Sequence, residues 1–247
     1  MTLLSVNVNK IALLRNSRGG ALPSVTKAAQ TAIDAGAHGI TVHPRPDGRH
    51  IRLQDVYDLA AMLTVEFNIE GNPTPLFLEL VEEVKPAQCT LVPDPPEALT
   101  SDHGWNLDEN ENENMDVLVP AIERLKNLGI RVSLFMDPDE EQIRLAKRTG
   151  ADRIELYTEA YARAFEKDEG TKGVVPYTRA AEVAGELNLG VNAGHDLNLQ
   201  NLGAFCQAVP KVLEVSIGHA LIDDALYKGL SSTVAAYAEV LRGVSAT

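Results

Sequence analysis

The sequence predicts an α/β protein whose eight parallel strands close into a (β/α)8 barrel, and three observations support this class. Short β-branched runs alternate with longer amphipathic segments along the whole chain, which is typical of a parallel sheet with crossover helices. About eight such units fit into 247 residues, a length at which such a barrel forms as one domain. No G-x-G-x-x-G turn follows the first strand, as the alternative open doubly wound sheet would favour. We therefore expect one barrel domain over residues 1–247.

The expected elements follow from hydrophobic periodicity. Strands are expected at 3–8, 39–42, 67–69, 88–92, 131–135, 153–157, 190–192 and 214–217. Helices are expected at 25–35, 53–63, 75–84, 115–128, 139–149, 177–187, 197–208, and from 222 to about 241. Thr74 and Asp137 each precede a proline, which favours a capping oxygen followed by proline at the first helical position. Glycines that suit the left-handed turn between a helix and the next strand stand at Gly36, Gly129, Gly150 and Gly190.

Composition excludes several kinds of partner. Asp and Glu total 35 against 22 Lys and Arg, a net charge of −13, and this excess repels nucleic acid and anionic membrane surfaces at long range. No apolar run approaches the length of a membrane span, and residues 1–8 lack the features of a signal peptide. Cys89 and Cys206 are too few for a disulfide framework, so we expect two reduced, buried thiols in a cytoplasmic protein.

The segment 93–114 interrupts the strand–helix rhythm. It is long, acidic and poor in apolar residues apart from Trp105. A loop of this length between a strand and its helix is usually a lid, a binding loop or disordered. Composition alone leaves a lid and a solvated loop equally open.

Candidate functional residues follow the predicted strands, because a barrel builds its active site at the carboxyl ends of its strands. The residues in these positions are Asn7, Asn9, Lys10, Arg15, Arg18, His43, Arg45, Arg49, His50, Asn68, Glu70, Glu155, Asn192, His195, Gly218 and His219. Four of the six histidines are among them. Each histidine alone would more often be a structural group, but their convergence on one rim favours a functional site. His38 and His103 lie elsewhere, and a structural role is expected for both.

Two further features suggest chemistry at this rim. Glu70 faces the barrel interior if Asn68 does, and desolvation there would raise its pKa toward the range of a general base. The alternative for Glu70 is a salt bridge to an arginine. For Glu155, a catalytic role and a structural role are equally open. Phosphate could be bound by Arg15, Arg18 and the Gly19-Gly20 turn, or at Gly218-His219, where a helix begins.

Other active-site classes fit the sequence less well. Histidines and carboxylates also bind zinc or manganese, but H-x-H and H-E-x-x-H are absent and the strand-end arginines would repel a cation. No G-x-S-x-G motif supports a serine nucleophile.

With these residues laid out, the sequence resembles the pyridoxine 5′-phosphate synthase (PdxJ) family of vitamin B6 biosynthesis. The matching segments are VNVNKIALLRNSRG, GITVHPRPDGRHI, FNIE, VSLFMDPDEEQI, VNAGHDLN and VSIGHALI. The resemblance implies a TIM barrel with extra helices, a homo-octamer (a tetramer of dimers), and a transferase without metal or organic cofactor. It also implies that 1-deoxy-D-xylulose 5-phosphate and 3-amino-2-oxopropyl phosphate condense to pyridoxine 5′-phosphate, phosphate and water.

The resemblance also implies residue roles. His43 and Glu70 would accept protons and His195 would donate one. The deoxyxylulose phosphate would be held by Asn9, Lys10, Arg45, His50 and Thr100. The aminoketone phosphate would be held by Asn7, Arg18, Asp196, Gly218 and His219, partly through backbone amides. The loop around Thr100 would be a lid that excludes water.

The chain departs from the family pattern at three places. Asn9-Lys10 stands where better-known members have Asp-His, and Lys10 could itself form the imine if its pKa were depressed. Asp196 replaces a glycine, so only its backbone role carries over, and the loop after Thr100 is unusually acidic. Two rival functions remain open, a metal-dependent phosphosugar epimerase or aldolase and a silent barrel that binds phosphorylated metabolites.

Overall fold

The structure is a computed structural model that describes residues 1–94, 98, 101–108, 110 and 113–244. Its centre is a closed barrel of eight parallel strands in the order of the chain, with β1 paired to both β2 and β8. The strands are β1 (Leu3–Asn7), β2 (Gly39–Val42), β3 (Glu66–Gly71), β4 (Gln88–Leu91), β5 (Arg131–Met136), β6 (Arg153–Tyr157), β7 (Gly190–Gly194) and β8 (Val212–Ile217). The predicted fold class is confirmed.

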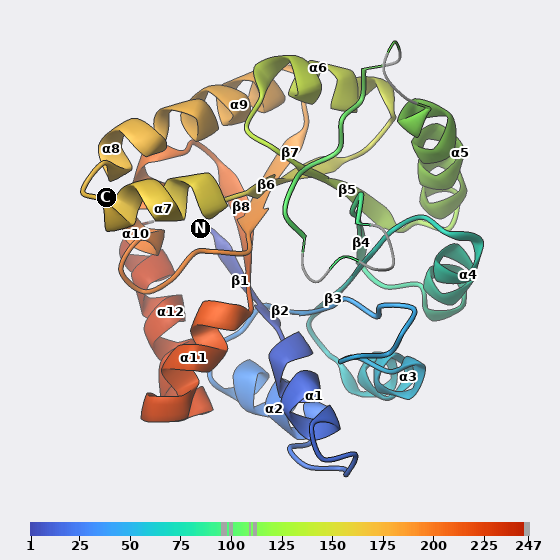
Figure 1. The fold of residues 1–247 in the computed structure, drawn as a ribbon, viewed down its shortest axis with the longest axis vertical. Helices are drawn as coiled ribbons and strands as arrows, with labels where there is room; N and C mark the ends of the chain where they lie inside the picture. The colour runs from blue at the N-terminus through green and yellow to red at the C-terminus, as the bar shows by residue number, and fades with distance from the viewer. Residues whose placement is uncertain (95–97, 99–100, 109, 111–112, 245–247) are drawn as a thin grey trace.

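Helices surround the barrel on all sides (Figure 1). They are α1 (Asn9–Asn16), α2 (Val25–Asp34), α3 (Leu53–Met62), α4 (Pro75–Val84), α5 (Asn114–Lys126), α6 (Glu140–Arg148), α7 (Glu159–Glu166), α8 (Gly170–Gly173), α9 (Val175–Glu186), α10 (Leu202–Ala208), α11 (His219–Lys228) and α12 (Leu230–Val244). Within the described residues, no helix combines the length and the apolar character needed to cross a membrane.

The predicted strands all form, whereas some helices differ from the prediction. Periodicity did not predict α1, α7 and α8, which have only eight, eight and four residues. The expected last helix is two helices, α11 and α12, because Gly229 takes a left-handed φ of 80° between them. Asp137 does not cap α6 as expected. Asp139 does, with its side chain accepting from the amides of Glu141 and Gln142.

β1 has an apolar outer face and a polar inner face. Leu4 and Val6 are fully buried in the main hydrophobic core, together with the inner faces of the helices. The intervening Ser5 points into the barrel. Its hydroxyl forms a hydrogen bond of 2.7 Å with the hydroxyl of Thr41 on the neighbouring strand β2. Thr90 donates to Asn68 Oδ1 at 3.1 Å on the same inner surface. These inner side chains are polar, and the residues that follow them toward the carboxyl ends of the strands lie at the mouth.

Both cysteines are free thiols, as predicted. Cys89 is buried in β4, whereas Cys206 in α10 is only partly buried. The expectation that both are buried is therefore wrong for Cys206.

Candidate active site

Asparagine side chains join the carboxyl ends of β1 and β2. Asn7 Oδ1 accepts from the Asn9 amide at 3.0 Å, and Asn9 Oδ1 accepts from the His43 amide at 2.9 Å. Gly218, which follows β8, packs against Asn7 so closely that an added Cβ would lie 3.1 Å from Asn7 Cβ. The structure thus brings four predicted site residues together at one mouth of the barrel.

Two imidazoles face each other beside this junction. The rings of His43 and His50 lie edge to face, with centroids 6.4 Å apart. Burial and then the charge of Arg45 hold the pKa of His43 well below its usual value, and the same two causes lower the pKa of His50 to about 4. His50 Nδ1 also accepts the Ile51 amide at 2.9 Å, which leaves the ring proton on Nε2. Both imidazoles are therefore neutral near pH 7.

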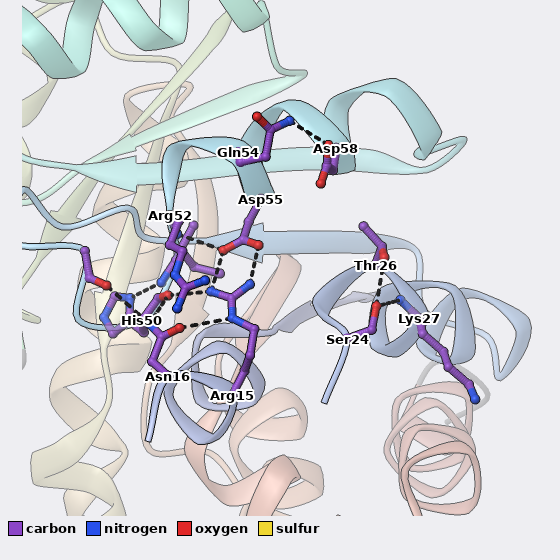
Figure 2. A network of polar contacts seen from close by, with 12 residues as sticks. Arg15, Asn16, Ser24, Thr26, Lys27, His50, Arg52, Gln54, Asp55 and Asp58 are labelled. Atoms are coloured by element: carbon purple, nitrogen blue, oxygen red, sulfur yellow. Dashed lines mark hydrogen bonds and ion pairs between the residues drawn. The ribbon is translucent and has the colours of Figure 1, made fainter. Parts of the chain in front are cut away.

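Arg15 supports the loop that carries His50, and its guanidinium is bound to protein groups. Its guanidinium forms a two-pronged ion pair with the buried Asp55 carboxylate of α3. It also donates to the His50 carbonyl at 3.1 Å. The side-chain amide of Asn16 donates to the same carbonyl at 2.8 Å (Figure 2). A bidentate arginine–carboxylate pair of this kind fixes geometry, so Arg15 positions the His50 loop.

Arg18 and Lys10 are two further predicted phosphate ligands that the structure describes. Arg18 and the Gly19-Gly20 turn are exposed, on the connection between α1 and α2 that projects at the edge of the molecule (Figure 1). Lys10 is the second residue of α1 and is partly exposed, and its charge contributes to the lowered pKa of His50. Thr100 lies outside the described residues, so its role stays a prediction.

Arg45 is buried and held by groups from the loop after β4. Its Nη2 donates to Asp94 Oδ2 at 2.6 Å, and its Nη1 donates to the Ala98 carbonyl at 2.9 Å. Sequence reasoning missed Asp94. The signal in the sequence is that Asp94 is the first carboxylate after the strand expected at 88–92.

Carboxyl groups are stacked inside the barrel beneath the mouth. Burial, reinforced by the charges of Glu155, Asp94 and Glu214, raises the pKa of Glu70 well above its usual value, while Arg45 opposes this. Burial and the charge of Glu214 likewise raise the pKa of Glu155 to about 8. Asn68 faces the interior, so the condition for an inward Glu70 is met.

His195 sits on a strained turn directly after β7. Its φ of 84° is left-handed, a conformation that costs a non-glycine residue about 1–2 kcal/mol. Thr158 clamps the turn by donating to the Gly194 carbonyl at 2.6 Å and accepting from the Asp196 amide at 3.3 Å. The Asp196 carboxylate contacts His195 Nδ1 at 2.6 Å. Asp196 therefore contributes a side-chain contact that the resemblance alone did not suggest.

An apolar wall lies on the opposite side of the mouth. Val92, Phe135 and Tyr157 form a buried cluster separate from the main core. The Tyr157 ring lies 5.3 Å from Phe135 and meets His195 edge to face, with centroids 5.2 Å apart. Trp105 anchors the adjoining loop, because its indole donates to the Leu91 carbonyl at 2.9 Å and its amide donates to the Phe135 carbonyl at 3.0 Å. Residues 101–108 are thus fixed against β4 and β5.

His219 begins α11, whose free N-terminal amides can attract an anion. Gly218 precedes it and closes the ring of strand ends against Asn7. Among the residues that the structure describes, no cluster of three or more histidine, cysteine or acidic side chains has the geometry to hold a metal ion.

A parallel (β/α)8 barrel with imidazoles, carboxyl groups and cations at the carboxyl ends of its strands has the architecture of a TIM-barrel enzyme. A family model described as "Pyridoxal phosphate biosynthesis protein PdxJ" matches residues 4–243. The chain therefore belongs to the PdxJ family.

Relatives with a common name support this membership. A protein of Porphyromonas gingivalis named pyridoxine 5′-phosphate synthase is 55% identical over 98% of this chain and 99% of its own length. A Bacteroides fragilis protein of the same name is 53% identical over 98% of this chain and all of its own.

Solved structures of low sequence identity support the fold alone. KGPDC from Streptococcus mutans matches with a TM-score of 0.63 at 11% identity, covering 99% of each chain. Phosphoribosyl anthranilate isomerase from Thermococcus kodakaraensis matches with a TM-score of 0.62 at 15% identity, covering 98% of this chain and 99% of its own.

Proposed function

We propose that this chain is a pyridoxine 5′-phosphate synthase. It condenses 1-deoxy-D-xylulose 5-phosphate with 3-amino-2-oxopropyl phosphate and releases phosphate and water. The observation that carries the proposal is the meeting of neutral imidazoles, a carboxyl group of raised pKa and a buried arginine at one mouth. Ring closure by imine and enamine chemistry needs groups of this kind, because each step moves a proton.

The two phosphates bind on the two sides of the β1 end. Arg45 uses two of its N–H donors on Asp94 and Ala98, and a guanidinium has five. The remaining donors, with Lys10 and His50, hold the deoxyxylulose phosphate. The amides at the start of α11, with Asn7 and His219, hold the aminoketone phosphate.

Proton acceptors stand on the β2 and β3 side. The amine of one substrate attacks the ketone of the other, and loss of water gives an imine. His43 is unprotonated near neutral pH because its pKa is lowered, so it can take the proton that the attacking amine loses. Glu70 is a stronger base than an ordinary carboxylate because its pKa is raised, and it removes the carbon-bound proton that converts the imine to an enamine.

The proton donor stands on β7. Elimination of phosphate and the second carbonyl attack leave an oxygen that must depart as water, which requires a proton. Asp196 contacts Nδ1 of His195, so proton exchange with the substrate goes through Nε2. The strained turn aims this ring, and Tyr157 supports its face.

Product formation tests the proposal directly. Purified protein is mixed with both substrates, with and without a chelator, and pyridoxine 5′-phosphate is followed by ultraviolet absorbance. We expect product in both samples. Loss of turnover with the chelator would indicate the metal-dependent class, and binding of both substrates without product would indicate a silent barrel. Borohydride trapping and mass spectrometry should show no adduct on Lys10.

We also infer a cytoplasmic homo-octamer, a tetramer of dimers. Large apolar side chains are exposed on and beside α1 and α11, which contact each other. They are Leu13, Leu14, Leu22, Leu226 and Tyr227. Burial of such side chains between copies would stabilise an assembly, whose mass light scattering measures.

A further inference from the structure

Asp94 is a buried carboxylate at the carboxyl end of β4, and the proposed reaction assigns it no role. The residue is 3% exposed. Its Oδ2 atom receives two short hydrogen bonds, from Arg45 Nη2 at 2.6 Å and from Ser101 Oγ at 2.6 Å. One oxygen of this carboxylate therefore orients Arg45, on which the deoxyxylulose phosphate is proposed to bind.

The other oxygen of Asp94 is buried and has no hydrogen-bond partner among the residues that the structure describes. Among the described residues, only Asp94 Oδ1 and Ser133 Oγ are side-chain atoms in this condition. A buried acceptor left unsatisfied costs about 1–3 kcal/mol, and more when it is charged. An ionised carboxylate can only accept hydrogen bonds, so the missing partner must be a donor.

The surroundings of Asp94 restrict what that donor can be. Asp94 lines a small cavity of about 30 Å³ together with His43, Arg45, Asn72 and Thr74. This volume accommodates one group of the size of a water molecule or a hydroxyl. A ligand whose phosphate lies on Arg45 would extend its carbon chain past this point, and a sugar phosphate carries hydroxyl groups on that chain.

We propose that Asp94 is a substrate-binding residue. Its Oδ1 accepts a hydrogen bond from a hydroxyl on the carbon chain of the phosphosugar that Arg45 holds. The inference rests on the proposed function, since it takes 1-deoxy-D-xylulose 5-phosphate as the ligand. Asp94 then does two things at once. It holds the guanidinium that binds the phosphate, and it selects sugars with a hydroxyl at one position. A buried group that needs a hydroxyl rejects an analogue lacking it, because the analogue leaves the group unpaired.

The inference is tested by changing the ligand and the residue separately and together, and comparing the binding affinities. Binding of 1-deoxy-D-xylulose 5-phosphate and of its two analogues, each lacking one chain hydroxyl, is measured by calorimetry on the wild type and on Asp94→Ala. We expect one analogue to bind the wild type on the order of 10- to 100-fold more weakly than the parent sugar. In Asp94→Ala this discrimination should fall to about twofold, although all three ligands bind more weakly because Arg45 loses its partner. If Asp94→Ala does not fold, Asp94→Asn keeps the shape, and its discrimination should fall several-fold.

Asp47→Asn is the matched control. Asp47 also pairs with an arginine, Arg49, at 2.7 Å, but its side chain is 47% exposed. This variant should keep the wild-type discrimination. Equal discrimination in wild type and Asp94→Ala, or none in the wild type, would overturn the role of Asp94 while product formation still upheld the synthase. A wild type that binds no sugar phosphate and forms no product would instead overturn the synthase function.

Discussion

The two sides of the barrel mouth differ in chemistry although they are built from equivalent strand ends. The β1–β3 side carries His43, Arg45 and His50, and its polar groups are held by asparagine side chains and ion pairs. The β4–β6 side presents Val92, Phe135 and Tyr157, an apolar cluster closed from outside by the anchored Trp105 segment.

In the proposed reaction, this difference would separate substrate binding and proton transfer from the exclusion of water. The polar side supplies charge and bases, and its imidazoles stay neutral because burial and nearby cations lower their pKa values. In the proposed reaction the apolar side would offer a dry surface to the ring that loses water as it forms, and its Tyr157 ring contacts His195. If the comparison is sound, substitutions on the polar side change rate and binding most, and those on the apolar side change them least.

Glu70→Gln should have the largest effect. The amide cannot accept the carbon-bound proton, so kcat should fall about 10²- to 10⁴-fold, the usual contribution of a general base. Binding of each substrate, measured by calorimetry, should change little because the amide keeps the shape of the carboxyl. Turnover equal to that of the wild type would remove Glu70 from the mechanism and the acid–base role from the polar side.

Asp55→Asn should destabilise the polar side of the mouth, because it removes the ion pair that holds Arg15 against the His50 loop. It leaves the buried Arg15 guanidinium without its counter-charge, so the free energy of unfolding in urea should fall by about 3 kcal/mol. The His50 loop loses its support at the same time, so KM for the sugar phosphate should rise. Asp58→Asn in the same helix removes only an exposed contact with Gln54 (Figure 2) and should change stability by less than about 0.5 kcal/mol. An equal change in both variants would show that the Arg15 pair is not structural.

The barrel and most strand ends could be predicted because local patterns specify them. Gly36, Gly129 and Gly150 have left-handed φ values of 104°, 78° and 86°, so the helix–glycine–strand joins were visible in the sequence. Gly190 was misjudged, because Asn188 takes the left-handed conformation at that join and Gly190 begins β7. Alternation also placed Glu70 and Asn68 on the inner face.

Long-range partners could not be predicted in the same way. Arg15 is paired to a carboxylate 40 residues away, and a guanidinium beside glycines has the same local signature whether it binds phosphate or Asp55. The Asp94–Arg45 pair spans 49 residues. The apolar wall was missed because it consists of ordinary strand residues that become a site component only when the barrel closes.

Glu155→Gln tests the raised pKa of a carboxyl group inside the barrel, below both sides of the mouth. The pKa of Glu155 is raised to about 8 in the folded protein, against 4.5 for an ordinary glutamate. Between these values the folded state keeps a proton that the unfolded state has released, so this group makes the wild type less stable as pH rises. The stability of Glu155→Gln relative to the wild type should therefore increase from pH 5 to pH 8, by roughly 3 to 4 kcal/mol. Glu141→Gln, at a side chain 85% exposed, should show no such trend. A flat difference for Glu155→Gln would mean that this carboxyl ionises normally.

Tyr157→Leu should give the smallest effect, and it tests the apolar side itself. Leucine keeps the wall dry but removes the ring that meets His195 edge to face, a contact worth about 0.5–1.5 kcal/mol. We expect kcat to fall about 2- to 10-fold with KM little changed, since the loss is in the orientation of the proton donor. Tyr157→Phe keeps the ring that meets His195 and removes only the hydroxyl, so it should retain kcat within about twofold. If kcat fell as much in Tyr157→Phe as in Tyr157→Leu, the hydroxyl rather than the ring would be responsible for the effect. The β4–β6 side would then be a second polar side, and the contrast between the two halves of the mouth would fail.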